Sequence, residues 1–169
     1  MILCDRDIKA YGRAGNLVIP YDEKLVNPAS YDIRVGLNLM QEGSGGGWKK
    51  IYIGDLKENH PYWLGPGDFV LIETLETLTV PNGFAMECKL KSSLARQGLN
   101  HSLAFWFDPG WYGVGTLEIS NVSKQQRIPI WYGMPIVQCI WHRLTGDAER
   151  PYQGRYQDAT GVELAKEPK

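Results

Sequence analysis

The sequence has few cysteines, almost no net charge and no long apolar run, and each of these absences excludes a class of protein. Its three cysteines, Cys4, Cys88 and Cys139, lie far apart and form no C-x-x-C pair, so we expect packed thiols and no zinc. Lysine and arginine total 18 against 19 aspartates and glutamates, which argues against a general nucleic-acid binder. The apolar runs fall short of the ~20 residues that a membrane-spanning helix needs, so no membrane partner is expected.

The N-terminal residues 1–13 alternate charged and apolar side chains and lack the apolar core of a signal peptide. We therefore expect a cytoplasmic protein. With 169 residues, of which 43% are hydrophobic, the chain can bury a core of its own. A single domain over residues 1–169 is the resulting prediction.

Glycine and proline are spread along the whole chain and separate short apolar runs. There are 19 glycines and 10 prolines, a pattern typical of short strands joined by tight turns. Such spacing predicts an all-β (mainly β) sandwich, jelly roll or barrel. The expected strands cover residues 17–19, 31–39, 50–53, 69–73, 84–90, 102–107, 115–121, 128–131 and 136–142.

Two short segments favour helices instead. Residues 4–11 have one apolar face and are followed by Gly12 and Gly15, which we expect to end the helix. Residues 92–97 combine a Ser-Ser start with good helix formers, and Gly98 follows as a stop. The polar segment 146–169 lacks periodicity and is either a frayed terminus or a tail that orders over a ligand.

The densest cluster of cationic and hydroxyl side chains is KLKSSLAR, residues 89–96. At the start of a helix the backbone N–H groups point outward, and the helix dipole favours an anion. Cationic side chains and hydroxyls add charge-assisted hydrogen bonds. The cluster is therefore either a cradle for a triphosphate or a capped surface turn.

A second candidate is Glu118, which lies in the otherwise apolar run 114–119. Because Leu117 and Ile119 flank it, Glu118 faces the opposite side of the strand from them. Burial would raise the pKa of its carboxyl group, as a general base or acid near neutral pH requires. The alternative is a carboxylate on a solvated outer face.

Six motifs follow one another along nearly the whole chain. They are LCDRDIKAY at 3–11, SYDIRVG at 30–36, LGPGDF at 64–69 with Glu73-Thr74, KSSLAR at 91–96, DPGW at 108–111 with Leu117-Glu118 and Asn121, and Pro151-Tyr152 with Arg155-Tyr156-Gln157. Together they resemble the dCTP deaminase branch of the trimeric dUTPase superfamily. The resemblance implies a distorted β-barrel or jelly roll, assembled as a homotrimer whose active sites are shared between subunits. It also implies that residues 146–169 form a flexible tail closing over the nucleotide.

For this family the resemblance implies deamination of dCTP without zinc. The H-x-E and P-C-x-x-C patterns of zinc deaminases are indeed missing from the sequence. Activation of the attacking water is assigned to Glu118, and positioning of that water and of the cytosine C4 region to Ser92 and Arg96. Asp108 would contact the deoxyribose 3′-OH or a nearby water.

The same resemblance implies how the rest of the nucleotide is held. The residues that it assigns to the phosphates are Lys91, Ser92, Ser93 and Arg155. Mg²⁺ would be bound mainly by the triphosphate, with no metal ligand from the protein. The other implied substrate contacts are Leu94, Ala95, Thr116, Leu117, Gln138, Tyr152 and Gln157. The substrate partners are then dCTP and dUTP.

Three outcomes are known in this superfamily: deamination to dUTP, deamination followed by hydrolysis to dUMP and pyrophosphate, and dUTP hydrolysis alone. Plain deaminases often carry Arg two residues before the DPGW aspartate, whereas this chain has Trp106. Bifunctional members tend to have an aromatic residue there, and Gln138 also resembles the bifunctional form. Both features favour dUMP formation, with Asp108 activating the second water.

Several positions depart from the family pattern. Lys91 replaces the usual Arg and loses bidentate phosphate contact. Segment 97–107 is one residue short, and Ala159-Thr160 stand where a Gln pair is usual. Bulky Phe105-Trp106 beside the base pocket would fit an unusual pyrimidine.

Two readings from other classes remain beside the enzyme. One is a nucleotide-binding regulatory relative without turnover, which the presence of both Glu118 and Asp108 disfavours. The other is an unrelated β-sandwich interaction module, disfavoured because the motifs are polar where an interaction patch would be aromatic.

Overall fold

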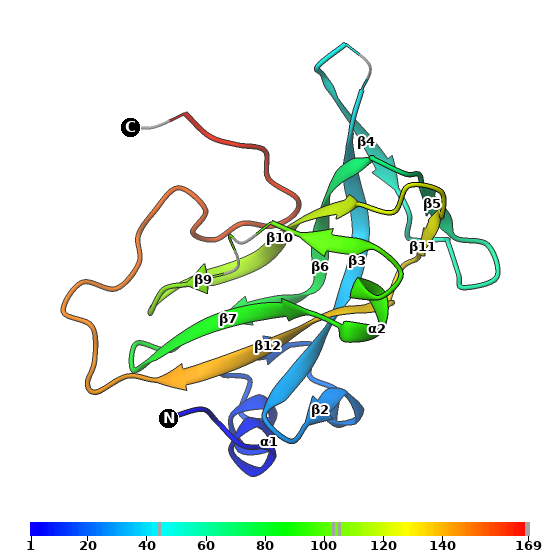
Figure 1. The fold of residues 1–169 in the computed structure, drawn as a ribbon. Coiled ribbons are helices and arrows are strands. Elements are labelled where there is room, and N and C mark those ends of the chain that lie inside the picture. Colours follow the sequence, from blue (N-terminus) through cyan, green and yellow to red (C-terminus); the bar gives the residue numbers. More distant parts are fainter. Residues whose placement is uncertain (44, 103, 105, 168–169) are drawn as a thin grey trace.

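The structure, a computed structural model, describes residues 1–43, 45–102, 104 and 106–167, and it is built mainly of β-strands (Figure 1). The helices are α1 (Asp5–Arg13), α2 (Ser92–Ala95) and the 3₁₀ turn η1 (Glu23–Leu25). The strands are β1 (Val18–Ile19), β2 (Val26–Asn27), β3 (Ser30–Glu42), β4 (Trp48–Tyr52), β5 (Tyr62–Leu64), β6 (Phe69–Thr79), β7 (Phe84–Leu90), β8 (Leu99–His101), β9 (Trp106–Phe107), β10 (Tyr112–Asn121), β11 (Ile128–Ile130) and β12 (Pro135–Arg143). The prediction of a mainly β fold with two short helices is confirmed.

One large antiparallel sheet, in the order β8-β10-β6-β3-β12-β7-β9, forms the body of the protein. The register shifts between Val114 and Thr116, between Pro135 and Val137, and between Val35 and Leu39. Such bulges bend strands and increase their twist, so the sheet curls into the half-barrel seen in Figure 1. β11 and β5 form a separate two-stranded sheet.

The expected strand over residues 102–107 is wrong. β8 pairs with β10 at one edge of the sheet, while β9 pairs with β7 at the other edge. The chain therefore leaves one edge after His101 and joins the opposite edge at Trp106, so it cannot run as one paired strand. Leu103 and Phe105 lie outside the described residues.

The helix predictions hold with changed boundaries. Gly12 does not end α1 but lies inside it, where a Cβ atom would come within 2.4 Å of the Tyr21 ring. Glycine is thus needed there for close packing, and the left-handed Gly15 (φ +72°) follows the helix end. The second helix ends at Ala95, short of Gln97. None of the helices in the described ranges is long and apolar enough to cross a membrane.

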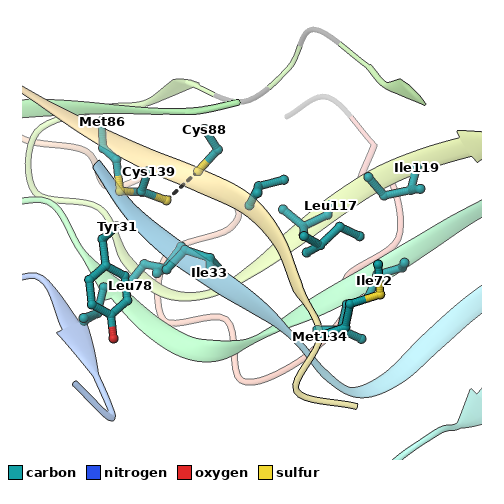
Figure 2. Close-up of a cluster of buried hydrophobic side chains, with 14 of the residues drawn as sticks. Tyr31, Ile33, Ile72, Leu78, Met86, Cys88, Leu117, Ile119, Met134 and Cys139 are labelled. Atoms are coloured by element: carbon teal, nitrogen blue, oxygen red, sulfur yellow. Dashed lines mark hydrogen bonds between the residues drawn. The ribbon is translucent and has the colours of Figure 1, made fainter. Parts of the chain in front are cut away.

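The core lies inside the curled sheet and includes two of the three cysteines (Figure 2). Cys88 and Cys139 face each other across β7 and β12, with their Sγ atoms 2.7 Å apart, and both are free thiols. Burial raises the pKa of the Cys139 thiol. The expectation of packed thiols is confirmed for this pair, whereas Cys4 is only half-buried.

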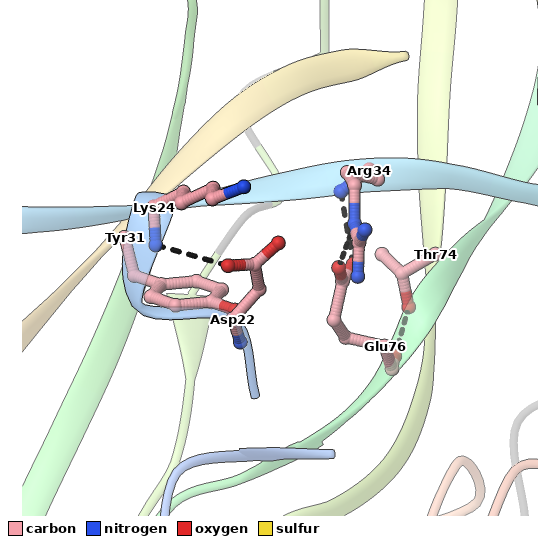
Figure 3. A network of polar contacts seen from close by, with 6 residues as sticks. All are labelled: Asp22, Lys24, Tyr31, Arg34, Thr74 and Glu76. Carbon is pink, nitrogen blue, oxygen red and sulfur yellow. Dashed lines mark hydrogen bonds and ion pairs between the residues drawn. The ribbon is translucent and has the colours of Figure 1, made fainter. Parts of the chain in front are cut away.

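A buried ion pair ties the two central strands together (Figure 3). The Glu76 side chain is fully buried on β6 and accepts hydrogen bonds from Arg34 Nε at 2.6 Å and Arg34 N at 2.9 Å. Thr74 Oγ1 donates to the carbonyl oxygen of Glu76 at 2.7 Å. Because breaking such a pair leaves an uncompensated charge, Arg34 has a structural role within the SYDIRVG motif.

Candidate active site

A cavity of about 500 Å³ is lined by strands from both halves of the large sheet and by the C-terminal segment, residues 146–167. Its walls come from β10, from β6 and β4, and from β9 with the turn after it. The lining is largely aromatic and aliphatic, with carboxylates among it. The lining residues are Trp48, Phe69, Leu71, Ala104, Trp106, Phe107, Asp108, Trp111, Val114, Thr116, Glu118, Tyr152, Tyr156, Ala159, Glu163, Leu164 and Ala165.

Glu118 reaches this cavity because of the alternation along β10. Leu117 and Ile119 are fully buried in the core, so the side chain between them points to the other face of the strand. That face is the cavity wall rather than an open outer surface. Glu118 Oε2 is buried and has no hydrogen-bond partner among the described residues. Burial raises the pKa of its carboxyl group above the usual range for glutamate.

Asp108 also lines the cavity, from the turn that follows β9. Its Oδ1 accepts a hydrogen bond from the indole Nε1 of Trp106 at 3.1 Å. The turn itself depends on glycine, because Gly110 has φ +87° and a Cβ there would lie 2.6 Å from Pro151 Cβ. Trp111 packs edge-on against Phe107, with ring centroids 4.6 Å apart, and anchors the turn in the core. The DPGW motif thereby fixes where the Asp108 backbone sits.

The C-terminal segment is hydrogen-bonded along β10 and forms the third wall. Val114 N donates to Ala159 O at 2.7 Å, and Glu163 N donates to Thr116 Oγ1 at 2.9 Å. These hydrogen bonds hold the segment in place, and its residues Tyr152, Tyr156 and Leu164 line the cavity.

Gln157 and Arg155, two expected substrate contacts, do not line the cavity. Gln157 Nε2 donates to Gly110 O at 3.1 Å, and its Oε1 accepts from Tyr112 N at 3.3 Å. Gln157 therefore joins the C-terminal segment to the DPGW turn. Arg155 is exposed and donates to Lys166 O.

The KSSLAR segment lies away from this cavity within one chain. Lys91 Nζ forms an ion pair with Asp32 Oδ2, and Leu94 is buried in the core. Gln138 accepts a hydrogen bond from Ser30 Oγ at 3.1 Å. The exposed members of the segment are Ser92, Ser93, Ala95 and Arg96.

The structure thus divides the expected site into two groups. Glu118, Asp108, Thr116 and Tyr152 meet at the cavity, whereas the KSSLAR residues and Gln138 lie elsewhere on the same chain. Leu117 belongs to the core, so only its backbone could contact a ligand. 

The sequence did not predict three features of the site. They are the Trp106–Asp108 hydrogen bond, the place of Glu163 in the cavity wall, and the hydrogen bond from Val162 N of the C-terminal segment to the Glu73 carboxylate. Glu73 stood in a motif, which was the signal available for it. The residue ranges that the structure describes contain no group of three or more His, Cys, Asp or Glu able to hold a metal ion.

The comparison with family models gives a match, described as dCTP deaminase-like, over residues 2–144. The chain belongs to the dCTP deaminase-like family. The matched range includes Glu118, Asp108 and the KSSLAR segment, and it stops before the C-terminal segment.

Known relatives of this family member cover most of its length. It is 43% identical over 164 residues to a dCTP deaminase, dUMP-forming, of Mycolicibacterium vanbaalenii, with 90% of this chain and 85% of that protein covered. It is 37% identical over 150 residues to a dCTP deaminase of Thermococcus kodakarensis, with 89% and 90% covered. Among solved structures, a 2′-deoxycytidine 5′-triphosphate deaminase from Agrobacterium tumefaciens is similar in fold, with a TM-score of 0.67 and 22% identity. That likeness covers 83% of this chain and 47% of the other, so this chain spans about half of it.

Proposed function

We propose that the protein deaminates dCTP to dUTP and then hydrolyses dUTP to dUMP and pyrophosphate, supplying dUMP for pyrimidine deoxynucleotide synthesis. The observation that carries the proposal is Glu118, whose carboxylate has a buried oxygen without a partner among the described residues and a raised pKa, and which lines the same cavity as Asp108. Relatives at 41–43% identity named dCTP deaminase, dUMP-forming, support the second step.

In the first step Glu118 acts as the general base. Its carboxylate takes a proton from water, and the water oxygen forms a bond to C4 of cytosine. The protonated carboxyl then returns the proton to the departing amino group as the C4–N bond breaks. The balance is dCTP plus water giving dUTP plus ammonia. A pKa raised by burial suits both halves of this exchange near neutral pH.

In the second step Asp108 acts on a second water. Its carboxylate orients the water and takes its proton, while the water oxygen bonds to the α-phosphorus and the bond to pyrophosphate breaks. The balance is dUTP plus water giving dUMP plus pyrophosphate. Mg²⁺ carried by the triphosphate would neutralise charge on the pyrophosphate leaving group.

We further propose that the active site is shared between subunits of a homotrimer. Within one chain, the exposed hydroxyls and guanidinium of Ser92, Ser93 and Arg96 lie away from the cavity that holds Glu118. Apposition of α2 from a neighbouring subunit would supply these groups to the cavity. Lys91 already pairs with Asp32, so its contact with phosphate would compete with that ion pair.

Residues 146–169 are proposed to close over the bound nucleotide as part of the single domain 1–169. Tyr152 already lines the cavity, and Gln157 ties the segment to the DPGW turn. Arg155, on the exposed side, would turn to a phosphate. We also propose a cytoplasmic location, because the three cysteines are free thiols, as in a reducing compartment.

The second candidate is a plain dCTP deaminase, which the relative from Thermococcus kodakarensis favours by its name. Purified protein incubated with dCTP or with dUTP, with and without Mg²⁺, separates the two. We expect ammonia and pyrophosphate in equal amounts from dCTP, with dUMP as the nucleotide product. Ammonia and dUTP in equal amounts, without pyrophosphate, would establish the plain deaminase.

A further inference from the structure

We propose that Trp106 is a positioning residue for the second reaction, and that its indole N–H sets how much dUTP is hydrolysed to dUMP. The inference rests on the proposed function and goes beyond it, because it assigns control of the product ratio to a residue other than the two reacting carboxylates. It starts from a single contact between two cavity-lining side chains.

Trp106 Nε1 donates a hydrogen bond to Asp108 Oδ1 at 3.1 Å, and both side chains line the cavity. Asp108 is exposed, and an exposed carboxylate samples several orientations unless a fixed donor holds it. The indole is such a donor, because its N–H lies in the plane of a rigid ring. With Oδ1 held in this way, Oδ2 is the oxygen that can accept a proton from water.

The indole is itself held by the edge of the sheet. Trp106 pairs with Glu87 in the β9–β7 register, and its ring lies 6.0 Å from the His142 ring, centroid to centroid. His142 Nε2 is 3.1 Å from Glu87 Oε1, and Lys89 Nζ is 2.7 Å from Glu87 Oε2. The Glu87 carboxylate, the His142 imidazole and the Trp106 indole therefore form a chain of contacts that leads to Asp108.

Core packing does not explain Trp106, because the residue is 55% exposed. A large exposed aromatic side chain contributes little to burial, so its hydrogen bond to Asp108 is the contact that sets this position apart. The bond is made to Asp108 and not to Glu118, so removing it should reduce hydrolysis more than deamination.

Trp106→Phe isolates the N–H group, because phenylalanine keeps an aromatic ring beside His142 and lacks the donor. Trp63→Phe is the matched control, since Trp63 is 52% exposed on β5 and does not line the cavity. Ammonia and pyrophosphate are measured in the same dCTP reactions with Mg²⁺, and kcat and KM are measured with dUTP.

We expect Trp106→Phe to lower kcat for pyrophosphate release about tenfold. Ammonia release should fall much less than pyrophosphate release, so that the ratio of pyrophosphate to ammonia drops several-fold, and Trp63→Phe should behave as wild type. An unchanged ratio of pyrophosphate to ammonia, or an equal loss of both, would overturn the positioning role. Wild-type protein that releases ammonia without pyrophosphate would instead overturn the second step, and this role with it.

Discussion

The carboxylate of Glu73, buried on β6, accepts a hydrogen bond from Val162 N of the C-terminal segment at 3.1 Å. Its other oxygen accepts from Leu37 N, Asn38 N and Asn38 Nδ2, at 2.9–3.0 Å. One carboxylate thus joins the bulge of β3 to the segment that walls the cavity. The C-terminal segment is therefore attached to the sheet through a buried side chain of β6.

Replacing Glu73 with alanine should release the C-terminal segment and weaken the fold. Buried N–H donors without an acceptor cost about 1–3 kcal/mol each, so we expect the free energy of unfolding to fall by at least ~2 kcal/mol. Urea unfolding measures this loss, and amide hydrogen exchange at Val162 should become fast. Glu149→Ala, at an exposed position of the same segment, is the control. Unchanged exchange at Val162 would remove Glu73 from the attachment.

Glu118→Gln should abolish deamination while nucleotide binding persists. The amide cannot take the proton of the attacking water, and loss of a general base costs about 10²–10⁴-fold in rate. Ammonia release and dCTP binding by calorimetry are the two measurements. Glu58→Gln, an exposed residue between β4 and β5, serves as the control. Deamination within threefold of wild type would exclude Glu118 from the mechanism.

The pH dependence of thermal stability in Glu118→Gln tests whether the pKa of Glu118 is raised in the folded protein. Because burial raises this pKa in the folded state, the folded protein binds the proton more tightly than the unfolded chain does. The stability gained by protonation is complete below the unfolded pKa of ~4.3 and is lost as pH rises through the folded pKa. Glu118→Gln, which stays neutral, should therefore gain Tm relative to wild type at pH 7 and lose that advantage near pH 4. A Tm difference that does not vary with pH would contradict the shift.

Mixed trimers test the shared active site. A chain with Arg96→Ala keeps its cavity and C-terminal segment, while a chain truncated after Arg150 keeps its α2. Each should be inactive alone, and mixing them should restore part of the activity, because one subunit's α2 would complete another's cavity. Two different affinity tags verify that the trimers are mixed. No recovery in verified mixed trimers would place each site within one chain.

Much of the fold could be predicted from local patterns. The alternation around Glu118 correctly placed its carboxylate on the opposite face of the strand from Leu117 and Ile119, which the structure buries in the core. Local patterns failed where the partner was distant in sequence. Segment 102–107 has strand propensity, but its two ends pair with opposite edges of the sheet.

The sequence predicted many residues of the candidate site, but it did not predict which of their side chains are in contact. The sequence shows that Trp106 precedes Asp108 by two positions, but it does not show that the turn brings the indole N–H to the carboxylate. Likewise Lys91 was expected at a phosphate, and its pairing with Asp32 depends on β3 and the end of β7 lying on the two sides of β12. Such contacts follow from tertiary packing, which motif spacing does not encode.

The central claim, two successive hydrolytic steps at one site, is tested most directly by running the dCTP reaction with Mg²⁺ in ¹⁸O-labelled water. Mass spectrometry should find dUMP carrying two labels, one on the uracil ring and one on the phosphate, together with unlabelled pyrophosphate. Asp108→Asn should shift the product toward dUTP with a single ring label. Wild-type protein that accumulates singly labelled dUTP, with no dUMP, would contradict the account.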